Sequence, residues 1–146
     1  MVSGLGDMGL SLSFAAIGSA LGTGVAGMAA IGAWKRAFMQ NKMAPFILIA
    51  FVGAPLSQTI YGMILRNAIL NAKLDPQTYP FQMVLGLAAG LAMGVSAWMQ
   101  GKAGASASDA LAETGKGFGN YIMVIGVIET VALFVMVFAM TAIPKG

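Results

Sequence analysis

The hydrophobic pattern of the chain forms four long apolar segments joined by short polar stretches. We place the segments at about residues 8–34, 44–70, 81–106 and 121–141. Each is long enough, as a helix, to cross a bilayer core of about 30 Å. The pattern therefore predicts an all-α membrane protein with four transmembrane helices.

The pattern repeats within the chain. A segment rich in small residues is followed by a bulkier one in each half, and three glycines recur about 72 residues later, with Gly18, Gly22 and Gly32 returning as Gly90, Gly94 and Gly104. This repetition indicates two tandem helical hairpins, residues 1–73 and residues 74–146, which form one membrane domain. The second hairpin alone carries an intramembrane acid.

The small residues of the first and third segments indicate close helix packing. Gly18 and Gly22 lie four residues apart and so share one helix face, and Gly90 and Gly94 repeat this spacing. In lipid, where hydrophobicity does not drive helices together, small residues let neighbouring backbones approach. We expect these two thin helices to pack tightly.

Glu129 lies near the centre of the fourth segment, among apolar and small residues. A charged carboxylate at that depth costs about 2.5–3.5 kcal/mol on insertion scales, so it should be paired, protonated or bound to a cation. The nearest candidates for a structural ion pair, Arg66 and Lys102, both lie near segment ends. The favoured hypothesis is that Glu129 is functional.

The second segment contains a polar stripe at helical spacing, made of Ala54, Ser57, Gln58 and Tyr61. Pro55 lies in the same turn and removes a backbone donor, which frees carbonyl oxygens there. Gln100 lies near the end of the third segment. The alternative for Ser57 and Gln58 is ordinary hydrogen bonding between helices, and the alternative for Gln100 is an interfacial position.

Together these residues offer a carboxylate, two amide oxygens, a hydroxyl and a backbone carbonyl. Hard oxygen ligands of this kind suit an alkali cation, whereas a proton site needs only the carboxylate and an acceptor. The surplus of oxygens favours Na⁺ at Glu129, with Tyr61 donating to the carboxylate. Transport of H⁺ by the same carboxylate stays open as an alternative.

Composition excludes several function classes. The chain is 58% hydrophobic and 9% charged, which is atypical of a soluble domain. It contains neither cysteine nor histidine, so disulfides, zinc sites and imidazole proton relays are excluded. The net charge of +3 is spread over loops, so we expect no nucleic-acid partner. No nucleotide-binding motif is present, so we expect no enzyme activity from the chain alone.

The basic residues serve instead as a topology signal. Five of them lie in or beside the loops after the first and third segments, namely Lys35, Arg36, Lys42, Lys102 and Lys116. The positive-inside rule then places the loops 35–43 and 107–117 in the cytoplasm and both termini outside the cell membrane. The first segment follows Asp7 rather than a basic stretch, so we expect it to be retained as a transmembrane helix.

Four motifs carry a resemblance to a known family. They are GSALGTG at 18–24, PLSQTIYG at 55–62, MQGKAGA at 99–105 and VIETVALF at 127–134. The chain thereby resembles, over almost its whole length, the proteolipid or K subunit of V-type ATPases, the four-helix members of the rotary ATPase c-ring family. The second-segment motif is similar to that of the sodium-translocating members.

The resemblance implies roles for single residues. Glu129 is similar to the ion-carrying carboxylate; Ser57, Gln58 and Gln100 to the side-chain ligands of Na⁺; Ala54 to the residue that supplies a backbone carbonyl; and Tyr61 to the tyrosine bonded to the carboxylate. The chain departs from the family pattern at Ser57, where threonine is common, at Thr59-Ile60 and at Leu21.

The resemblance also implies a partner set. Identical subunits form a ring in the lipid bilayer, a stator subunit a with an arginine meets the ring, and central stalk subunits connect it to a soluble sector that handles ATP. Two further hypotheses are a small cation or multidrug exporter that uses one membrane glutamate, and a purely structural membrane protein. The exporter predicts an aromatic-lined cavity around the acid, whereas Glu129 has aliphatic neighbours.

Overall fold

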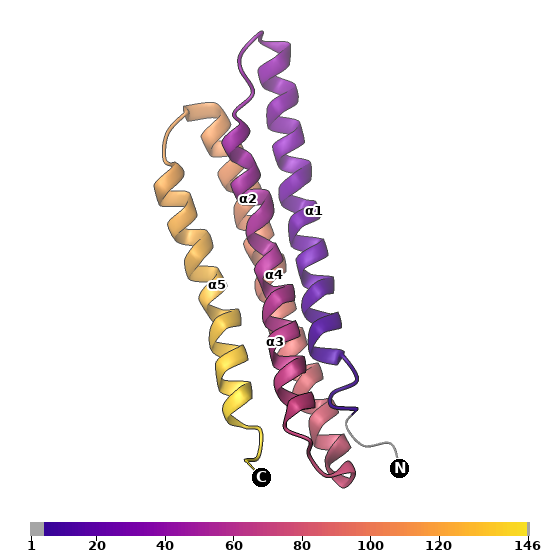
Figure 1. Cartoon of the computed structure of the whole chain (residues 1–146). Helices are drawn as coiled ribbons and strands as arrows, with labels where there is room; N and C mark the ends of the chain where they lie inside the picture. Colours follow the sequence, from indigo (N-terminus) through magenta and orange to yellow (C-terminus); the bar gives the residue numbers. More distant parts are fainter. Residues whose placement is uncertain (1–4, 146) are drawn as a thin grey trace.

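The computed structural model describes residues 5–145, and it is a bundle of four long helical spans. The spans are Leu10–Met39, Phe46–Asn71, Pro76–Thr114 and Phe118–Thr141, each long and apolar enough to cross a membrane. They lie along one common axis, and the described chain begins and ends at the same end of the bundle (Figure 1). No strand occurs within residues 5–145. The predicted all-α architecture with four membrane helices is confirmed.

The spans differ in regularity. The first is the single helix α1 (Leu10–Met39) and the last is α5 (Phe118–Thr141), whereas the second consists of η1 (Phe46–Leu48), α2 (Ile49–Gly53), η2 (Ala54–Leu56) and α3 (Ser57–Asn71). The third begins with η3 (Pro76–Thr78) and continues as α4 (Tyr79–Thr114). The division into hairpins at residues 73 and 74 stays a prediction, and it falls between α3 and η3.

The break in the second span lies at Pro55, as the sequence predicts. Pro55 has no N–H to donate, and the chain passes through the tight 3₁₀ turn η2 before α3 begins. Within this turn the backbone N–H of Ser57 donates to the carbonyl of Ala54. The turn therefore sets where the polar stripe of α3 starts.

Helices α1 and α4 pack backbone against backbone. A methyl group on Gly18 would lie 2.0 Å from the carbonyl oxygen of Gly94, and one on Gly22 would lie 2.2 Å from that of Ala97. The predicted close approach is confirmed there, and Gly101 makes a similar contact with Gly22 that the repeat did not indicate. Gly32 has no atom within 4 Å of such a methyl group, so the repeated glycines are not equivalent.

Both predicted hairpin loops are too long. Helix α1 continues to Met39, into the loop predicted at residues 35–43, and α4 continues to Thr114, through most of the loop predicted at residues 107–117. Polar side chains mark the edge of the apolar segment but do not end a helix. The hydrophobic pattern therefore located the apolar part of each helix but underestimated the lengths of α1 and α4.

Ion pairs hold these helix extensions together. Arg36 of α1 bonds to Asp109 of α4 and lies 3.5 Å from a carboxylate oxygen of Glu113. The second extension ends where Gly115 and Gly117 adopt positive φ angles of 65° and 91°. These left-handed conformations favour glycine, so the turn to α5 is confined to three residues.

The turn between the two halves is built around Asp75 and Pro76. Asp75 accepts a hydrogen bond of 2.8 Å from the backbone N–H of Gln77, and Pro76 begins η3. Pro80 lies in the first turn of α4. A proline is tolerated there because the first N–H groups of a helix have no partner within it.

Asp7 anchors the start of α1, a role that the sequence did not reveal. It is 1% exposed, and its carboxylate accepts from the backbone N–H groups of Gly9 at 2.9 Å and Ser11 at 2.8 Å. It fits against Gly86, where a methyl group would lie 2.3 Å from a carboxylate oxygen. The first span is thereby capped and held against α4.

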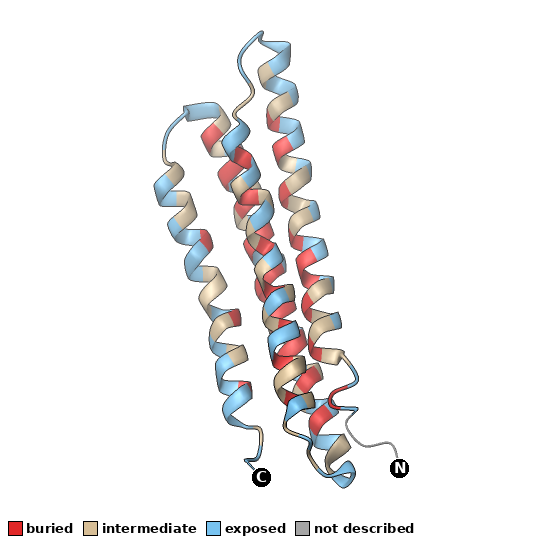
Figure 2. Cartoon of the chain, viewed as in Figure 1, coloured by how far each residue is buried: buried red, intermediate tan, exposed pale blue. Residues whose placement is uncertain are grey.

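Helix α5 is the most exposed span. Only 11% of its most apolar 18-residue stretch is buried, against 28–44% of the corresponding stretches in the other three spans. Buried residues concentrate on the facing sides of α1, α4 and the second span, and α5 carries few (Figure 2). The outer surface of α5 is thus left for lipid or another protein chain.

Candidate functional site: a carboxylate at mid-span

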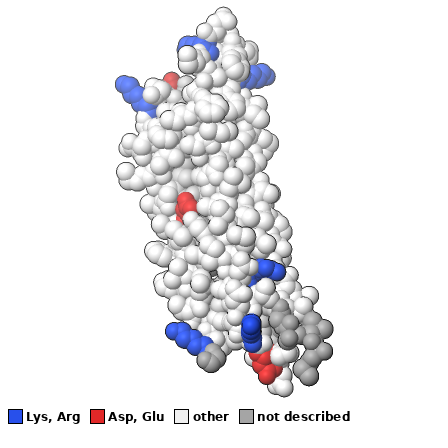
Figure 3. Space-filling model, in the orientation of Figure 1, with Lys and Arg blue, Asp and Glu red and all other residues white. Residues whose placement is uncertain are grey.

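Glu129 lies at the middle of α5 and is half-buried. Figure 3 shows acidic atoms about halfway along the face, while most other charged side chains, basic and acidic, lie toward its two ends. The salt bridges within residues 5–145 join Arg36 to Asp109 and Glu113, and none of them includes Glu129. The alternative of a structural ion pair with Arg66 or Lys102 is therefore wrong for the described chain.

Tyr61 is brought to Glu129 from the second span. Its hydroxyl donates to Oε1 of Glu129 at 2.6 Å, across 68 residues of sequence. Tyr61 packs against an apolar cluster whose buried residues come from α1, α3, α4 and α5. The predicted bond from Tyr61 to the carboxylate is present in the structure.

Gln100 approaches the carboxylate from α4. Its Nε2 donates to the backbone carbonyl of Ile125 at 3.0 Å and lies 3.4 Å from Oε2 of Glu129. The side chain is 0% exposed, so the interfacial alternative for Gln100 is wrong. The Ile125 carbonyl was not foreseen, because a sequence pattern gives no signal for a backbone acceptor.

Gln58 links the second span to Gln100. Its Nε2 donates to Oε1 of Gln100 at 2.8 Å, and it too is 0% exposed. The hydroxyl of Ser57 lies 3.2 Å from Oε1 of Gln58 and 3.1 Å from the carbonyl oxygen of Ala54. The six predicted residues thus join in one hydrogen-bonded chain, the mid-span network, which comprises Ala54, Ser57, Gln58, Gln100, Glu129 and Tyr61.

The carbonyl of Ala54 is less free than the sequence suggested. It accepts from both the backbone N–H and the hydroxyl of Ser57. At Pro55 the backbone hydrogen bonds join residues three apart, as in a 3₁₀ helix, so this oxygen still has a partner. A cation that uses the Ala54 carbonyl would therefore compete with Ser57.

The mid-span network concentrates oxygen atoms of several kinds at one depth. A carbonyl oxygen has two lone pairs, so Oε1 of Gln100 has acceptor capacity beyond its bond from Gln58. The carboxylate adds the negative charge that a monovalent cation or a proton would neutralise. Chemically, the arrangement suits a hard cation or a proton that must be held in an apolar surrounding.

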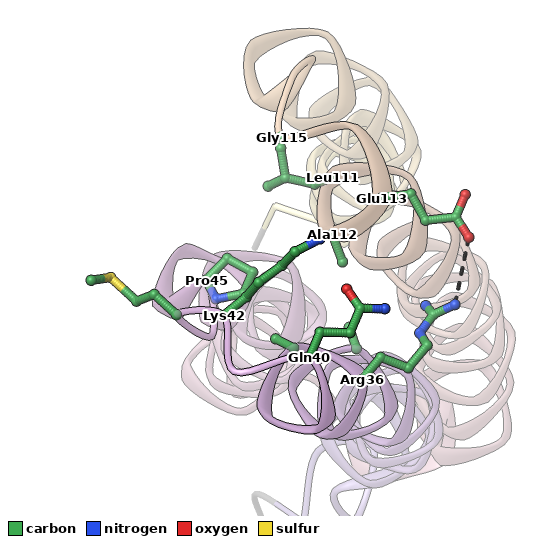
Figure 4. A pocket seen from close by; sticks show the side chains of 11 residues that line it. Arg36, Gln40, Lys42, Pro45, Leu111, Ala112, Glu113 and Gly115 are labelled. Atoms are coloured by element: carbon green, nitrogen blue, oxygen red, sulfur yellow. Dashed lines mark ion pairs between the residues drawn. The ribbon is translucent and has the colours of Figure 1, made fainter.

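A pocket lies away from the mid-span network, at the end of the bundle where α1 and α4 end. It has a volume of about 480 Å³ and lies between the ends of α1 and α4 and the loop that follows α1. Figure 4 shows Arg36 reaching toward Glu113 at this pocket. None of its lining residues belongs to the mid-span network. The two features are therefore separate.

Comparison with known proteins finds a family similarity in the second half of the chain. Residues 83–142 match the model of the family described as the C subunit of ATP synthase. This segment is similar to the ATP synthase C-subunit family. It contains Gln100 and Glu129, so two members of the mid-span network lie within the matched segment.

The similarity to this family extends beyond residues 83–142. The chain is 34% identical over 140 residues to the A-type ATP synthase subunit K of Methanocaldococcus jannaschii. The alignment covers 95% of this chain, whereas the chain spans 60% of the length of that curated relative. The resemblance to c-ring proteolipids is thus confirmed, and with its four apolar helices the chain is a multi-pass membrane protein.

Proposed function

We propose that the chain is a rotor-ring subunit of a rotary ATPase, and that it carries Na⁺ across the membrane on Glu129. One observation carries the proposal: a continuous chain of hydrogen bonds joins Ala54 of η2, through Gln58 and Gln100, to a carboxylate at the middle of a span. ATP is handled by other subunits of the complex. Neither comparison points to the exporter alternative.

The proposed ring has the thin helices α1 and α4 on its inside and the second span and α5 on its outside. Two observations support this arrangement: α1 and α4 touch through Gly18 and Gly94, and α5 is the least buried span. Glu129 then lies on the outer helix, where a neighbouring copy or lipid covers it. Its half-buried state in the single chain fits that position.

The mechanism rests on the charge of the site. With Na⁺ or a proton bound, the carboxylate is close to neutral and tolerates lipid; without it, the charge is costly in an apolar surrounding. We propose that the stator arginine meets the empty site and that an ion enters from the other side. Each monovalent ion moved across the membrane changes the free energy by about 2.3 kcal/mol per 100 mV.

Na⁺ fits the network better than H⁺ does. Protonation of Glu129 would need no oxygen beyond its own carboxylate, yet Gln58 and Gln100 are both fully buried at this depth. Burying two amides is favourable only where their hydrogen-bonding capacity is used. Each amide oxygen already accepts one hydrogen bond and has a second lone pair left. A dehydrated cation uses that remaining capacity, because oxygen ligands replace its lost water.

We expect Na⁺ to protect Glu129 from a hydrophobic carbodiimide in the purified complex. The reagent modifies protonated carboxyl groups, so a bound cation blocks the reaction. Labelling is measured by mass spectrometry of the chain at fixed pH while NaCl replaces choline chloride at constant ionic strength. Slower labelling with rising Na⁺ supports the proposal, whereas equal labelling in both salts at every pH would favour H⁺ as the carried ion.

We also propose that the turn after α1 faces the cytoplasm and that both termini face outward. The chain has no cysteine, so single-cysteine variants report without background. A membrane-impermeant thiol reagent should label Gln40→Cys in inside-out vesicles and Lys145→Cys in right-side-out vesicles; both positions are exposed. The reverse pattern would invert the proposed topology.

A further inference from the structure

The polar attachment of α5 to the rest of the bundle is confined to one short stretch. In the described part of the chain, the hydrogen bonds between α5 and other helices reach the stretch 125–129, through the carbonyls of Ile125 and Ile128 and the carboxylate of Glu129. The bonds of Thr130 and Thr141 stay within α5. Elsewhere α5 is held by apolar contacts alone.

Ser96 supplies one of these bonds, and it does so without touching the carboxylate. Its hydroxyl donates to the carbonyl of Ile128 at 2.9 Å, and its side chain is 5% exposed. Ser96 lies one helical turn before Gln100 on α4, and the two side chains donate to carbonyls on neighbouring turns of α5. The pair fixes both the height and the rotation of α5 beside α4.

The bonds of Gln100 and Ser96 differ in whether they depend on the position of the Glu129 carboxylate. Gln100 also lies 3.4 Å from Oε2 of Glu129, so its position depends on where the carboxylate points. Tyr61 bonds to the carboxylate directly. The bond of Ser96 is to the backbone alone, so it does not depend on where the carboxylate of Glu129 points.

We propose that Ser96 is a positioning residue for ion exchange: it holds the turn of α5 that precedes Glu129 in register while the carboxylate leaves and re-enters the mid-span network. This inference rests on the proposed ion-carrying role of Glu129. Without the tether, α5 slides or rotates against an apolar surface, and the carboxylate returns less often to the donors of Gln100 and Tyr61.

The test measures carbodiimide labelling of Glu129 in complexes that carry Ser96→Ala or Ser96→Thr. In sodium-free buffer at fixed pH, Ser96→Ala should label about fivefold faster than wild type, the factor expected for the loss of one ordinary hydrogen bond. The Na⁺ concentration for half-protection should rise by a similar factor. Ser96→Thr keeps the hydroxyl and should restore both values toward wild type.

Ser108→Ala is the matched control. Ser108 is also a buried serine of α4, but its hydroxyl has no hydrogen-bond partner in the structure, so its removal should leave both values unchanged. The inference is overturned if Ser96→Ala labels like wild type, or if Ser108→Ala changes labelling as much. Absence of Na⁺ protection in the wild type would contradict only the proposal that Na⁺ is the carried ion. The role of Ser96 would still be tested by the labelling rate in sodium-free buffer.

Discussion

Glu129→Gln abolishes ATP-driven uptake of radioactive sodium by the assembled complex in vesicles. Glutamine keeps the size of the side chain and an acceptor for the hydroxyl of Tyr61, so the bundle and its packing should survive. It removes the negative charge, without which no oxygen of the mid-span network offsets the cost of dehydrating a cation. Uptake should fall to the level measured without ATP.

The matched control is Glu113→Gln. This change removes the same charge from a glutamate at the end of α4, which pairs with Arg36 outside the mid-span network. Arg36 keeps its bond to Asp109, so uptake should stay close to wild type. Undiminished uptake by the Glu129→Gln complex, at equal amounts of assembled protein, would remove the central role of Glu129.

We expect Gly18→Ala to destabilise the chain more than a glycine-to-alanine change at any other position of α1. The new carbon would lie 2.0 Å from the carbonyl oxygen of Gly94, which is backbone and has no rotamer to change. The helices α1 and α4 must move apart, and overpacking of this kind costs about 1–3 kcal/mol or more. Thermal unfolding of the purified protein in mild detergent should occur at a clearly lower temperature.

Gly32→Ala provides the comparison within the same helix. Gly32 belongs to the same glycine repeat, but a methyl group there meets no atom within 4 Å. Alanine also favours a helix over glycine by about 1 kcal/mol, so stability should be unchanged or slightly higher. If Gly18→Ala unfolds at the same temperature as Gly32→Ala, the backbone contact between α1 and α4 is not as described.

The arrangement of the mid-span network could be anticipated from the sequence only in part. Helical spacing placed Ala54, Ser57, Gln58 and Tyr61 on one stripe, and the cost of a buried charge singled out Glu129. Gln100 entered the predicted set through its amide oxygen and its place near the end of the third segment, not through helical spacing. Its bonds to Gln58 and Ile125 depend on three segments meeting, and no local pattern reports such a meeting.

The contacts that Asp7 and Ser96 make could not be predicted from the sequence for the same reason. Asp7 was visible only as the residue before an apolar segment, yet it is buried against Gly86 and caps α1. Ser96 looked like one small residue among many, because a serine that donates to a backbone carbonyl on another helix leaves no trace in periodicity.

By itself, the sequence determined the four membrane helices, the break at Pro55 and the one acid at mid-span. Hydrophobic runs, a proline and an isolated charge act locally, and their energetic consequences hold whatever the neighbours are. The tertiary structure alone decided where the helices end and which glycines meet. Arg36 joins the ends of two helices by bonding to Asp109 across 73 residues. Gly18 matters where Gly32 does not, because Gly18 faces the backbone of α4 and Gly32 does not.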